Sequence, residues 1–302
     1  MIKLISFSAF LLLFSLGSYA QRWKTDRQSL VLDAGISHFM GDLGGGGEDA
    51  AHFFGVRDLD FSATRPVLSV KYRYRILEMV SAKAGITWAI LAADDASSAS
   101  AGRKMRNLSF SSNIFEFSFH GEYYFVKEKA NPRYSFSSLH SIRNLSAYVF
   151  TGASVIYFNP KAKLDGTKYA LQPLGTEGQG VHDSMPSPYS KIAIGWPIGL
   201  GAKYTLTKKI SVGIEISNTF TTSDYIDDVH YQYYDNNAIS TKYGDIAGKL
   251  ADRHIDVNGN DLPPYSSGTL HRGGNEYNDA FIFTVVTLTY SLKRDNTGLP
   301  KF

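Results

Sequence analysis

The stretch SKIAIGWPIGLGAKYTLTKKISVGIEISNTF, residues 190–220, decides the fold of this chain. Apolar side chains occupy every second position over residues 192–206, and the alternation resumes over residues 210–216 after a short polar turn. Because side chains of a β-strand point alternately to its two faces, this period of two predicts two antiparallel strands joined by a tight turn.

The residues on the second face of this hairpin indicate that the first, apolar face contacts lipid. It combines glycines at four positions with Pro197 and the charged Lys203 and Glu215. Glycine weakens a strand in an ordinary core, whereas a narrow barrel needs small side chains where its walls approach each other. We therefore predict a transmembrane β-barrel over a soluble sandwich, which would show the same alternation.

The first 20 residues have the pattern of a secretory signal peptide. Lys3 precedes an apolar run over residues 4–16, and the small residues Ser18 and Ala20 stand before the expected cleavage point. The run is shorter than the roughly 20 residues that a membrane-spanning helix needs. We expect residues 21–302 to form one outer-membrane barrel domain, since strands remain the only means of spanning a membrane.

Composition excludes several classes of function. The chain has no cysteine, so a disulfide framework, a thiolate metal site and a cysteine nucleophile are all ruled out. Its formal net charge of +3 over 302 residues gives no case for nucleic-acid binding. Aromatic residues make up 14%, which suits a barrel with aromatic girdles at the two membrane interfaces.

The same alternation recurs along the chain and predicts eight strands in total. Leu108 and Phe110 have the opposite parity to Phe115, so we expect a bulge near residues 111–113. The polar tracts 159–189 and 221–277 are predicted to be loops. The six strands outside the opening hairpin are expected at residues 29–39, 66–75, 80–90, 115–125, 145–158 and 278–292.

The connections alternate in length in the manner of a bacterial barrel. Tight turns are expected near residues 76–78 and 207–209, whereas the connections on the other side are long. Short periplasmic turns, long external loops and periplasmic termini are typical of such proteins. The basic tract 127–144 is the exception, and we interpret it as an enlarged periplasmic turn. The predicted fold is all-β, an eight-stranded antiparallel transmembrane β-barrel with long external loops.

The polar faces of the predicted strands collect four acids and four bases. Desolvated charges require partners, so we expect a balanced ion network that fills the lumen. An eight-stranded barrel has room for side chains and none for an aqueous channel. We therefore do not expect a porin, and we expect activity at the rims and loops. The expected network consists of Asp33, Lys71, Arg73, Lys83, Glu116, Glu122, Lys203 and Glu215.

Candidate chemical sites are few. His120 with Glu116 and Glu122 would suit a metal or an acid–base group, but the ion network is the favoured interpretation because substrate has no access to mid-strand residues. Asp224, Asp227 and Asp228 could hold calcium, yet they lack the spacing of a calcium loop, and a solvated rim is favoured. His254 and His271 are isolated, and a G-x-S-x-G motif is absent. We expect neither an enzyme nor a cofactor, and leave calcium at residues 224–228 open.

The enlarged basic turn is a candidate docking site for an acidic periplasmic partner. A plain hydrophilic turn explains the same composition, and the sequence leaves both interpretations open. Electrostatic docking would mainly contribute encounter rate and register. The four residues concerned are Lys127, Lys129, Arg133 and Arg143.

LQPLGTEGQG at residues 171–180 is the most specific of several motifs that resemble those of the PorG-like outer-membrane barrels of the type IX secretion system in Bacteroidetes. The resemblance covers nearly the whole mature chain, and the motifs occur in the family's order. The others are RNLSF at 106–110 leading to NIFE at 113–116, FNPKA at 158–162, DYIDDV at 224–229, FMGD at 39–42 and NDAF at 278–281.

This resemblance implies a non-enzymatic component of a protein-export machine. Its expected partners are outer-membrane lipids, a PorK-like lipoprotein and a PorN-like protein of the periplasmic ring, with a role in motility in gliding species. The motif residues lie in and beside external loops, so they could pack those loops or recognise a partner. The rival function is a small barrel whose loops bind surface ligands, as an adhesin or protective protein would. A lipid-modifying enzyme would need a Ser, His and acid cluster, which we do not find.

Overall fold

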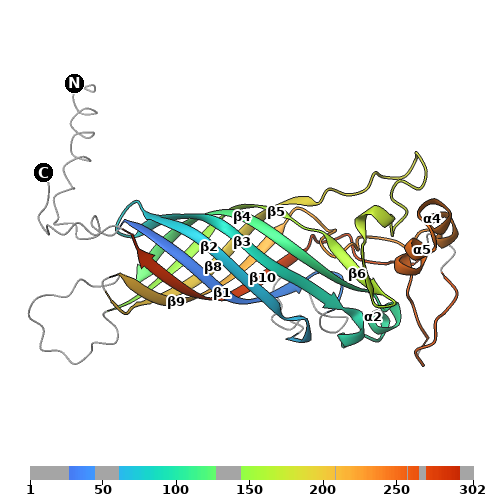
Figure 1. Cartoon of the computed structure of the whole chain (residues 1–302), viewed down its shortest axis with the longest axis horizontal. Helices are drawn as coiled ribbons and strands as arrows, with labels where there is room; N and C mark the ends of the chain where they lie inside the picture. The colour runs from blue at the N-terminus through green and yellow to red at the C-terminus, as the bar shows by residue number, and fades with distance from the viewer. Residues whose placement is uncertain are drawn as a thin grey trace, which may run out of the picture.

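The computed structural model describes residues 27–44, 61–126, 144–207, 209–256, 258–264 and 270–292. The expected signal peptide and the basic turn with Lys127, Lys129, Arg133 and Arg143 lie outside the described residues. Between these gaps the chain is dominated by long strands (Figure 1).

Eight long strands close into an antiparallel barrel, which confirms the predicted fold class. Each strand pairs with its neighbours around the ring, β1 pairs with β10, and pairing of β3 with β4 completes the closure. The order around the barrel is β3-β2-β1-β10-β9-β8-β5-β4. The strands are β1 (Gln28–Met40), β2 (Arg65–Arg75), β3 (Val80–Asp94), β4 (Ser109–Val126), β5 (Leu145–Tyr157), β8 (Ile192–Thr205), β9 (Ile210–Thr221) and β10 (Ala280–Ser291).

The opening hairpin of the sequence forms β8 and β9, and its glycines face inward. A Cβ on Gly201 would lie 2.4 Å from the Tyr148 ring, and one on Gly199 would lie 2.4 Å from the Phe150 ring. The glycines therefore make room for aromatic side chains that cross the narrow lumen.

The outer wall carries a belt of exposed apolar side chains around the ring. Eight residues, one from each strand, are between 42% and 61% exposed. Water would penalise a continuous apolar surface of this extent, whereas the hydrocarbon core of a bilayer accommodates it. The barrel is accordingly a transmembrane one. The eight residues are Leu32, Leu68, Ile86, Phe117, Val155, Ile194, Ile216 and Val286.

The two ends of the barrel differ in their connections. At one end, here the turn end, β2–β3 and β8–β9 are joined by short turns, and the Leu292 amide bonds to the Gln28 carbonyl at 2.9 Å. The other end, here the loop end, carries the long connections on the right of Figure 1. Both ends of the described chain thus lie at the turn end. In the described part, no helix is long and apolar enough to cross a membrane.

The connections at the loop end contain more regular structure than the sequence predicts. Tract 159–189 holds a hairpin whose turn uses positive φ at Asp165 and Gly166, and tract 221–277 holds two helices, the first capped by the Asp235 side chain. Each element is short, so its local pattern is weak. The elements are η3 (Phe61–Ala63), η4 (Asp95–Ser97), α2 (Ala101–Arg106), β6 (Pro160–Leu164), β7 (Thr167–Ala170), η5 (Gln172–Leu174), α4 (Asn236–Tyr243) and α5 (Asp245–Ala251).

The prediction of a bulge near residues 111–113 is wrong. Strand β4 pairs with β3 without a shift from Ser109 to Tyr123, and its register shift, against β5, lies at Tyr124 and Val126 instead. Phe110 and Ile114 share the inward parity of the lumen charges and are 4% and 0% exposed. The change of pattern marks a change in the interior, from polar in mid-barrel to apolar at the loop end.

Candidate functional site

A cluster of four ionised side chains fills the lumen toward the turn end. Lys83 Nζ lies 2.7 Å from Glu215 and 2.9 Å from Glu122, and Arg73 Nε lies 2.7 Å from Glu122. Arg73 also reaches Glu215 at 3.3 Å, and the Tyr148 hydroxyl donates to Glu215. The four residues come from β2, β3, β4 and β9, so the cluster ties together strands on different sides of the ring.

The remaining members of the expected network lie apart from this cluster. Lys71 pairs with Asp33 at 2.8 Å, and Ser69 donates to the same carboxylate. The Lys203 ammonium lies 5.7 Å from the centre of the Tyr124 ring. Glu116 is 4% exposed, and its Oε1 atom has no hydrogen-bond partner among the described residues.

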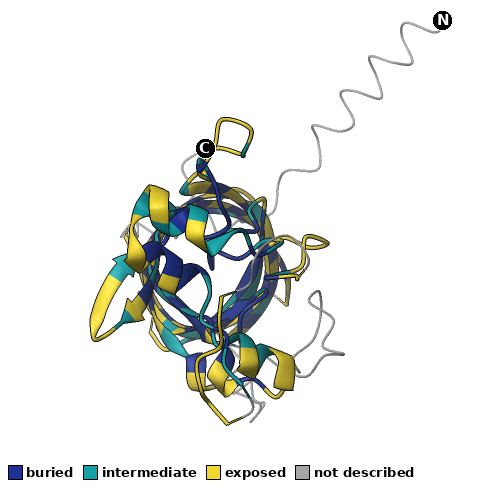
Figure 2. Ribbon diagram, turned by 90° about the vertical axis from the view of Figure 1, so that its right-hand side faces the viewer, coloured by how far each residue is buried: buried dark blue, intermediate teal, exposed yellow. Residues whose placement is uncertain are grey.

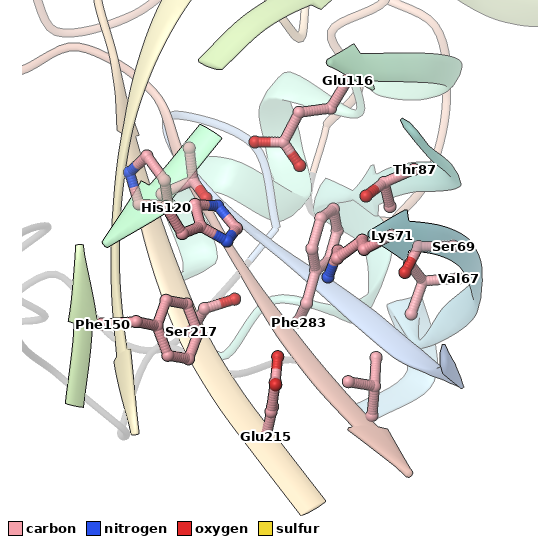
Figure 3. A pocket seen from close by; sticks show the side chains of 13 residues that line it. Val67, Ser69, Lys71, Thr87, Glu116, His120, Phe150, Glu215, Ser217 and Phe283 are labelled. Carbon is pink, nitrogen blue, oxygen red and sulfur yellow. The ribbon is translucent and has the colours of Figure 1, made fainter. Parts of the chain in front are cut away.

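Glu116, His120, Lys71 and Glu215 line one small internal cavity of about 10 Å³ (Figure 3). Both ring nitrogens of His120 are buried without a partner among the described residues. Such a volume is close to the minimum for one water molecule, and the polar lining suits water. Glu122 belongs to the ion cluster and not to this cavity, so the triad of His120, Glu116 and Glu122 is not brought together as one site.

An apolar core occupies the lumen on the loop side of the cavity. Barrel residues such as Ile114, Ile156 and Phe283 pack in one cluster with Leu43, Ile226 and Leu250 from the connections. The connections are thus packed onto the barrel interior. We call the described parts of segments 41–44, 95–108, 158–191 and 222–279 the loop cap. Its helices and loops lie in front of the ring of strands in the view along the barrel (Figure 2).

Arg272 joins two segments of the loop cap, 158–191 and 222–279. Its guanidinium is buried, donates to the backbone carbonyls of Ala251 and Asp228, and lies 3.2 Å from Glu177. Burial would lower the pKa of Arg272, but Glu177 and Asp228 raise it above its usual value, so the group is held charged. The fork geometry of arginine suits this kind of multiple contact.

Arg106 performs a similar role nearer the barrel wall. It donates to both carboxylate oxygens of Asp95, at 2.7 and 2.8 Å, and to the carbonyls of Asp42 and Arg272. Asp95 is fully buried and also accepts from the amides of Gly44 and Leu108. Together, the two arginines therefore contact all the long interstrand loops at the loop end.

Buried aspartates anchor the turns of the loop cap. Asp227 accepts from the Leu43 and Val229 amides, and Asp279 accepts from the Ile226 amide. Burial raises the pKa of both carboxyls, and Asp42 adds to the effect through its charge. Burial likewise raises the pKa of Asp224 to about 9, with further contributions from Asp227, Asp42 and Glu177. His230 Nδ1 lies 2.5 Å from Asp224 Oδ2, within hydrogen-bond distance.

Asp228 anchors a further turn of the loop cap through its side chain. It accepts from the Thr176 and Tyr189 hydroxyls at 2.5 and 2.6 Å. The Tyr189 ring stacks on Tyr225 with centroids 4.5 Å apart. Burial raises the pKa of Asp228 to about 6, although Arg272 opposes that shift. These contacts make residues 224–228 part of a packed interior, so the expected solvated rim is wrong for Asp224, Asp227 and Asp228, which are 7%, 1% and 1% exposed.

No group of three or more His, Asp or Glu side chains within the described ranges is placed to hold a metal ion. His254 contacts Asp252 at 2.6 Å, and His271 lies against Tyr231 on the surface. These histidines thus have local neighbours of their own.

The motifs behind the family resemblance converge in the loop cap. Thr176 and Glu177 of the 171–180 motif contact residues of the 224–229 motif and its continuation. Gly41 and Asp42 lie beside Asp279 and Gly274, and Arg106 bonds to the Asp42 carbonyl. Segments as far apart as Asp42 and Gly274, 232 residues in the sequence, are therefore brought into one packed unit. Arg272 and Asp95 belong to this unit, and neither is predicted from the sequence, because neither stands in a motif or in a strand pattern.

A closed eight-stranded barrel with an apolar outer wall, a filled lumen and a packed loop cap is a transmembrane β-barrel of the outer-membrane kind. A family model described as a domain of unknown function, DUF6089, matches residues 8–251. The chain belongs to this family. It matches no curated protein sequence.

Among the solved structures similar to the chain are three small barrels from bacteria. Neisserial surface protein A shares 8% identity at a TM-score of 0.39, with 88% of this chain and 97% of that one covered. OprG, an outer-membrane protein from Pseudomonas aeruginosa, shares 8% at 0.34, with 89% and 97% covered. Ail of Yersinia pestis, solved with the heparin analogue sucrose octasulfate, shares 8% at 0.35, with 87% and 98% covered.

Proposed function

We propose that this chain is a non-enzymatic outer-membrane component of the type IX protein secretion machinery. In this role its turn end faces the periplasm and docks the ring made by a PorK-like lipoprotein and a PorN-like protein. The loop end faces outward, and both termini are periplasmic. Gliding motility would depend on it in species that glide.

The observation that carries this proposal is the convergence of the family-like motifs in one packed unit. Residues of the 39–42, 106–110, 171–180, 224–229 and 278–281 motifs contact one another through named hydrogen bonds, such as Thr176 to Asp228 and Ile226 to Asp279. Motifs that recur in a family's order and also build one substructure support a shared architecture more strongly than separate matches do.

The filled lumen supports a role at the surfaces of the barrel. The lumen toward the turn end is filled by the ion cluster of Arg73, Lys83, Glu122 and Glu215. The lumen toward the loop end is filled by the apolar core. Solute passage and lumenal catalysis both need open space that this arrangement leaves no room for. The orientation follows the general rule for bacterial barrels, in which short turns and termini are periplasmic.

Affinity isolation from crosslinked outer membranes tests the proposal. The intact protein is compared with a variant in which Lys127, Lys129, Arg133 and Arg143 are all changed to Ser. A matched control removes four positive charges at the opposite end, by changing Lys104, Lys191, Lys242 and Lys249 to Ser. We expect the ring proteins to be recovered with the intact protein and the control, and to be lost with the basic-turn variant while that barrel still inserts.

Two outcomes would change the conclusion. Recovery of the ring with all three proteins would keep the secretion role but move the docking site away from the basic turn. If no ring protein is recovered with the intact protein, the secretion role fails. The remaining function would then be a barrel whose outer loops bind surface ligands, as an adhesin or protective protein does.

A further inference from the structure

The β6–β7 hairpin extends the barrel wall beyond the membrane belt. Strand β6 pairs with the first residues of β4 through Ser111 and Lys161, and β7 forms the free edge of the sheet. Viewed along the barrel, this hairpin stands outside the ring of strands (Figure 2). It is therefore placed beside the part of the bilayer that surrounds the loop end.

The register shows which way the hairpin lysines point. In β4 the odd-numbered residues face the lipid, as Phe117 and Phe115 do with 59% and 51% exposure. Ser111 has the same parity, and directly paired residues project to the same side of a sheet. Lys161 thus continues the lipid-facing wall of β4, and Lys163 follows it two residues further along β6.

Packing on the other face fixes this orientation. Ala162 is 5% exposed, and Leu164 and Tyr169 pack against the apolar core of the loop end. The hairpin consequently cannot rotate its lysines toward the protein without exposing these apolar side chains. The outer face changes from phenylalanines in the belt to lysines just beyond it.

Within the described ranges, the lysines of this face lack counter-charges. Lys163 and Lys168 are direct cross-strand partners, an arrangement in which like charges repel. Among the residues that the structure describes, Lys161, Lys163 and Lys168 form no ion pair, and neither does Asp165, the one acid of the hairpin. An external anion held between the lysines would relieve the repulsion.

We propose that Lys161, Lys163 and Lys168 form a binding face for the phosphate-bearing headgroups of the lipid leaflet around the loop end. The face lies directly beyond the apolar belt, which is where headgroup phosphates lie in a bilayer. Lysine is a common phosphate ligand, and it binds as a point charge. The proposal rests on the outer-membrane placement given above, in which that leaflet carries a phosphorylated glycolipid.

Lipid titration of the full chain in detergent micelles tests the proposal. Native mass spectrometry measures the apparent Kd for bisphosphorylated lipid A, for its dephosphorylated form, and for inorganic phosphate at the same phosphate concentration. The test variant is K161S/K163S/K168S. The control K104S/K242S/K249S removes the same charge from exposed positions in the loop cap. A third variant, K161R/K163R/K168R, keeps the charge.

We expect the intact protein, the control and the arginine variant to bind phosphorylated lipid A alike. The serine variant should bind about 100-fold more weakly, since each basic residue near an anionic surface contributes about 1 kcal/mol. Added salt should reduce the difference. The serine variant also loses the repulsion between Lys163 and Lys168, so its barrel should fold at least as well.

Each other result overturns the proposal in a distinguishable way. Equal binding by the serine variant removes the hairpin from lipid recognition. Equal binding of the dephosphorylated lipid shows that only the acyl chains are bound. Equal binding of inorganic phosphate shows an unspecific anion site. If the intact chain fails to insert into vesicles at all, the membrane placement fails and the proposed function fails with it.

Discussion

Lys83 on β3 and Glu215 on β9 meet across the barrel lumen, with Nζ 2.7 Å from Oε1. Lys83 is fully buried and Glu215 is 3% exposed. The two strands are not neighbours in the ring, so this ion pair spans the interior. Arg73 and Glu122 complete the cluster, in which each charge has two opposite partners.

Removing one charge from this cluster is expected to destabilise the barrel. In Glu215→Gln, Arg73 and Lys83 share Glu122 as their one remaining acid in the cluster, and an uncompensated buried charge costs about 3 kcal/mol or more. Urea titration of the folded barrel in micelles measures the change. Lys209→Gln, at an exposed turn, is the control and should change the unfolding free energy little.

The double variant Lys83→Met with Glu215→Gln separates charge from packing. It restores the balance of one base to one acid in the cluster, so part of the lost stability should return. A barrel that loses nothing in Glu215→Gln, or loses more in the double variant than in the sum of the single changes, would contradict this account of the lumen.

The loop cap is expected to depend on Arg272. In Arg272→Met, Glu177 and Asp228 lose their buried partner, and the carbonyls of Asp228 and Ala251 lose a donor. We expect the loop cap to become sensitive to proteinase K while the barrel stays folded. Limited proteolysis, with the unheated gel mobility of the barrel as a fold check, measures both. Lys104→Met, an exposed change in the same cap, should remain resistant; equal resistance of Arg272→Met would show that the cap does not need this arginine.

The lumen and the loop cap differ in how far the sequence predicts them. Glu215 lies in a strand whose parity alone assigns it to the interior, because the period of two relates sequence directly to face. Arg272 has no such pattern, and its partner Glu177 is 95 residues away in the sequence. Parity also identifies Phe110 as inconsistent with a polar lumen, but it cannot show that the interior itself becomes apolar at the loop end. That change depends on the folded connections, whose short helices and hairpin carry weak local signals.

The packing of the loop cap is expected to loosen as pH rises. The pKa of Asp224 is raised from 3.8 to about 9 in the folded protein by burial and by the nearby carboxyls of Asp227, Asp42 and Glu177. The folded state therefore binds a proton more tightly than the unfolded state does. The stability that this proton provides is fully present below pH 3.8, falls as pH rises, and is lost at about pH 9.

Asp224→Asn should remove this pH dependence, because the amide has the shape of the carboxyl and can hydrogen-bond to His230 without titrating. Proteolysis rates of the intact protein and the variant are compared at pH 5, 7 and 9. The rate of the intact protein divided by the rate of the variant at each pH cancels the pH dependence of the protease itself. The ratio should rise with pH, and a constant ratio would show that Asp224 does not lose its proton in this range.

Gly178 and Gly166 have nearly the same φ, so alanine at the two positions distinguishes the cost of backbone strain from the cost of a steric clash. Gly178 has φ of +82° and Gly166 has φ of +84°. A Cβ on Gly178 would lie 2.4 Å from the Tyr234 ring, whereas a Cβ on Gly166 would have no atom within 4 Å. Alanine at either position adopts a left-handed conformation that costs about 1–2 kcal/mol. Only Gly178→Ala also forces Tyr234 or the loop to move, and such overpacking costs about 1–3 kcal/mol more.

The two alanine variants should therefore differ in the opening of the loop cap. When reclosing is faster than cleavage, the proteolysis rate follows the open population. We expect cleavage within α4 and α5 to be at least about 5-fold faster in Gly178→Ala than in Gly166→Ala. Because the backbone cost is shared, the ratio of rates reports the contact with Tyr234 alone. Equal rates would show that residues 171–180 yield without disturbing the rest of the cap, and that this segment is not part of its packed core.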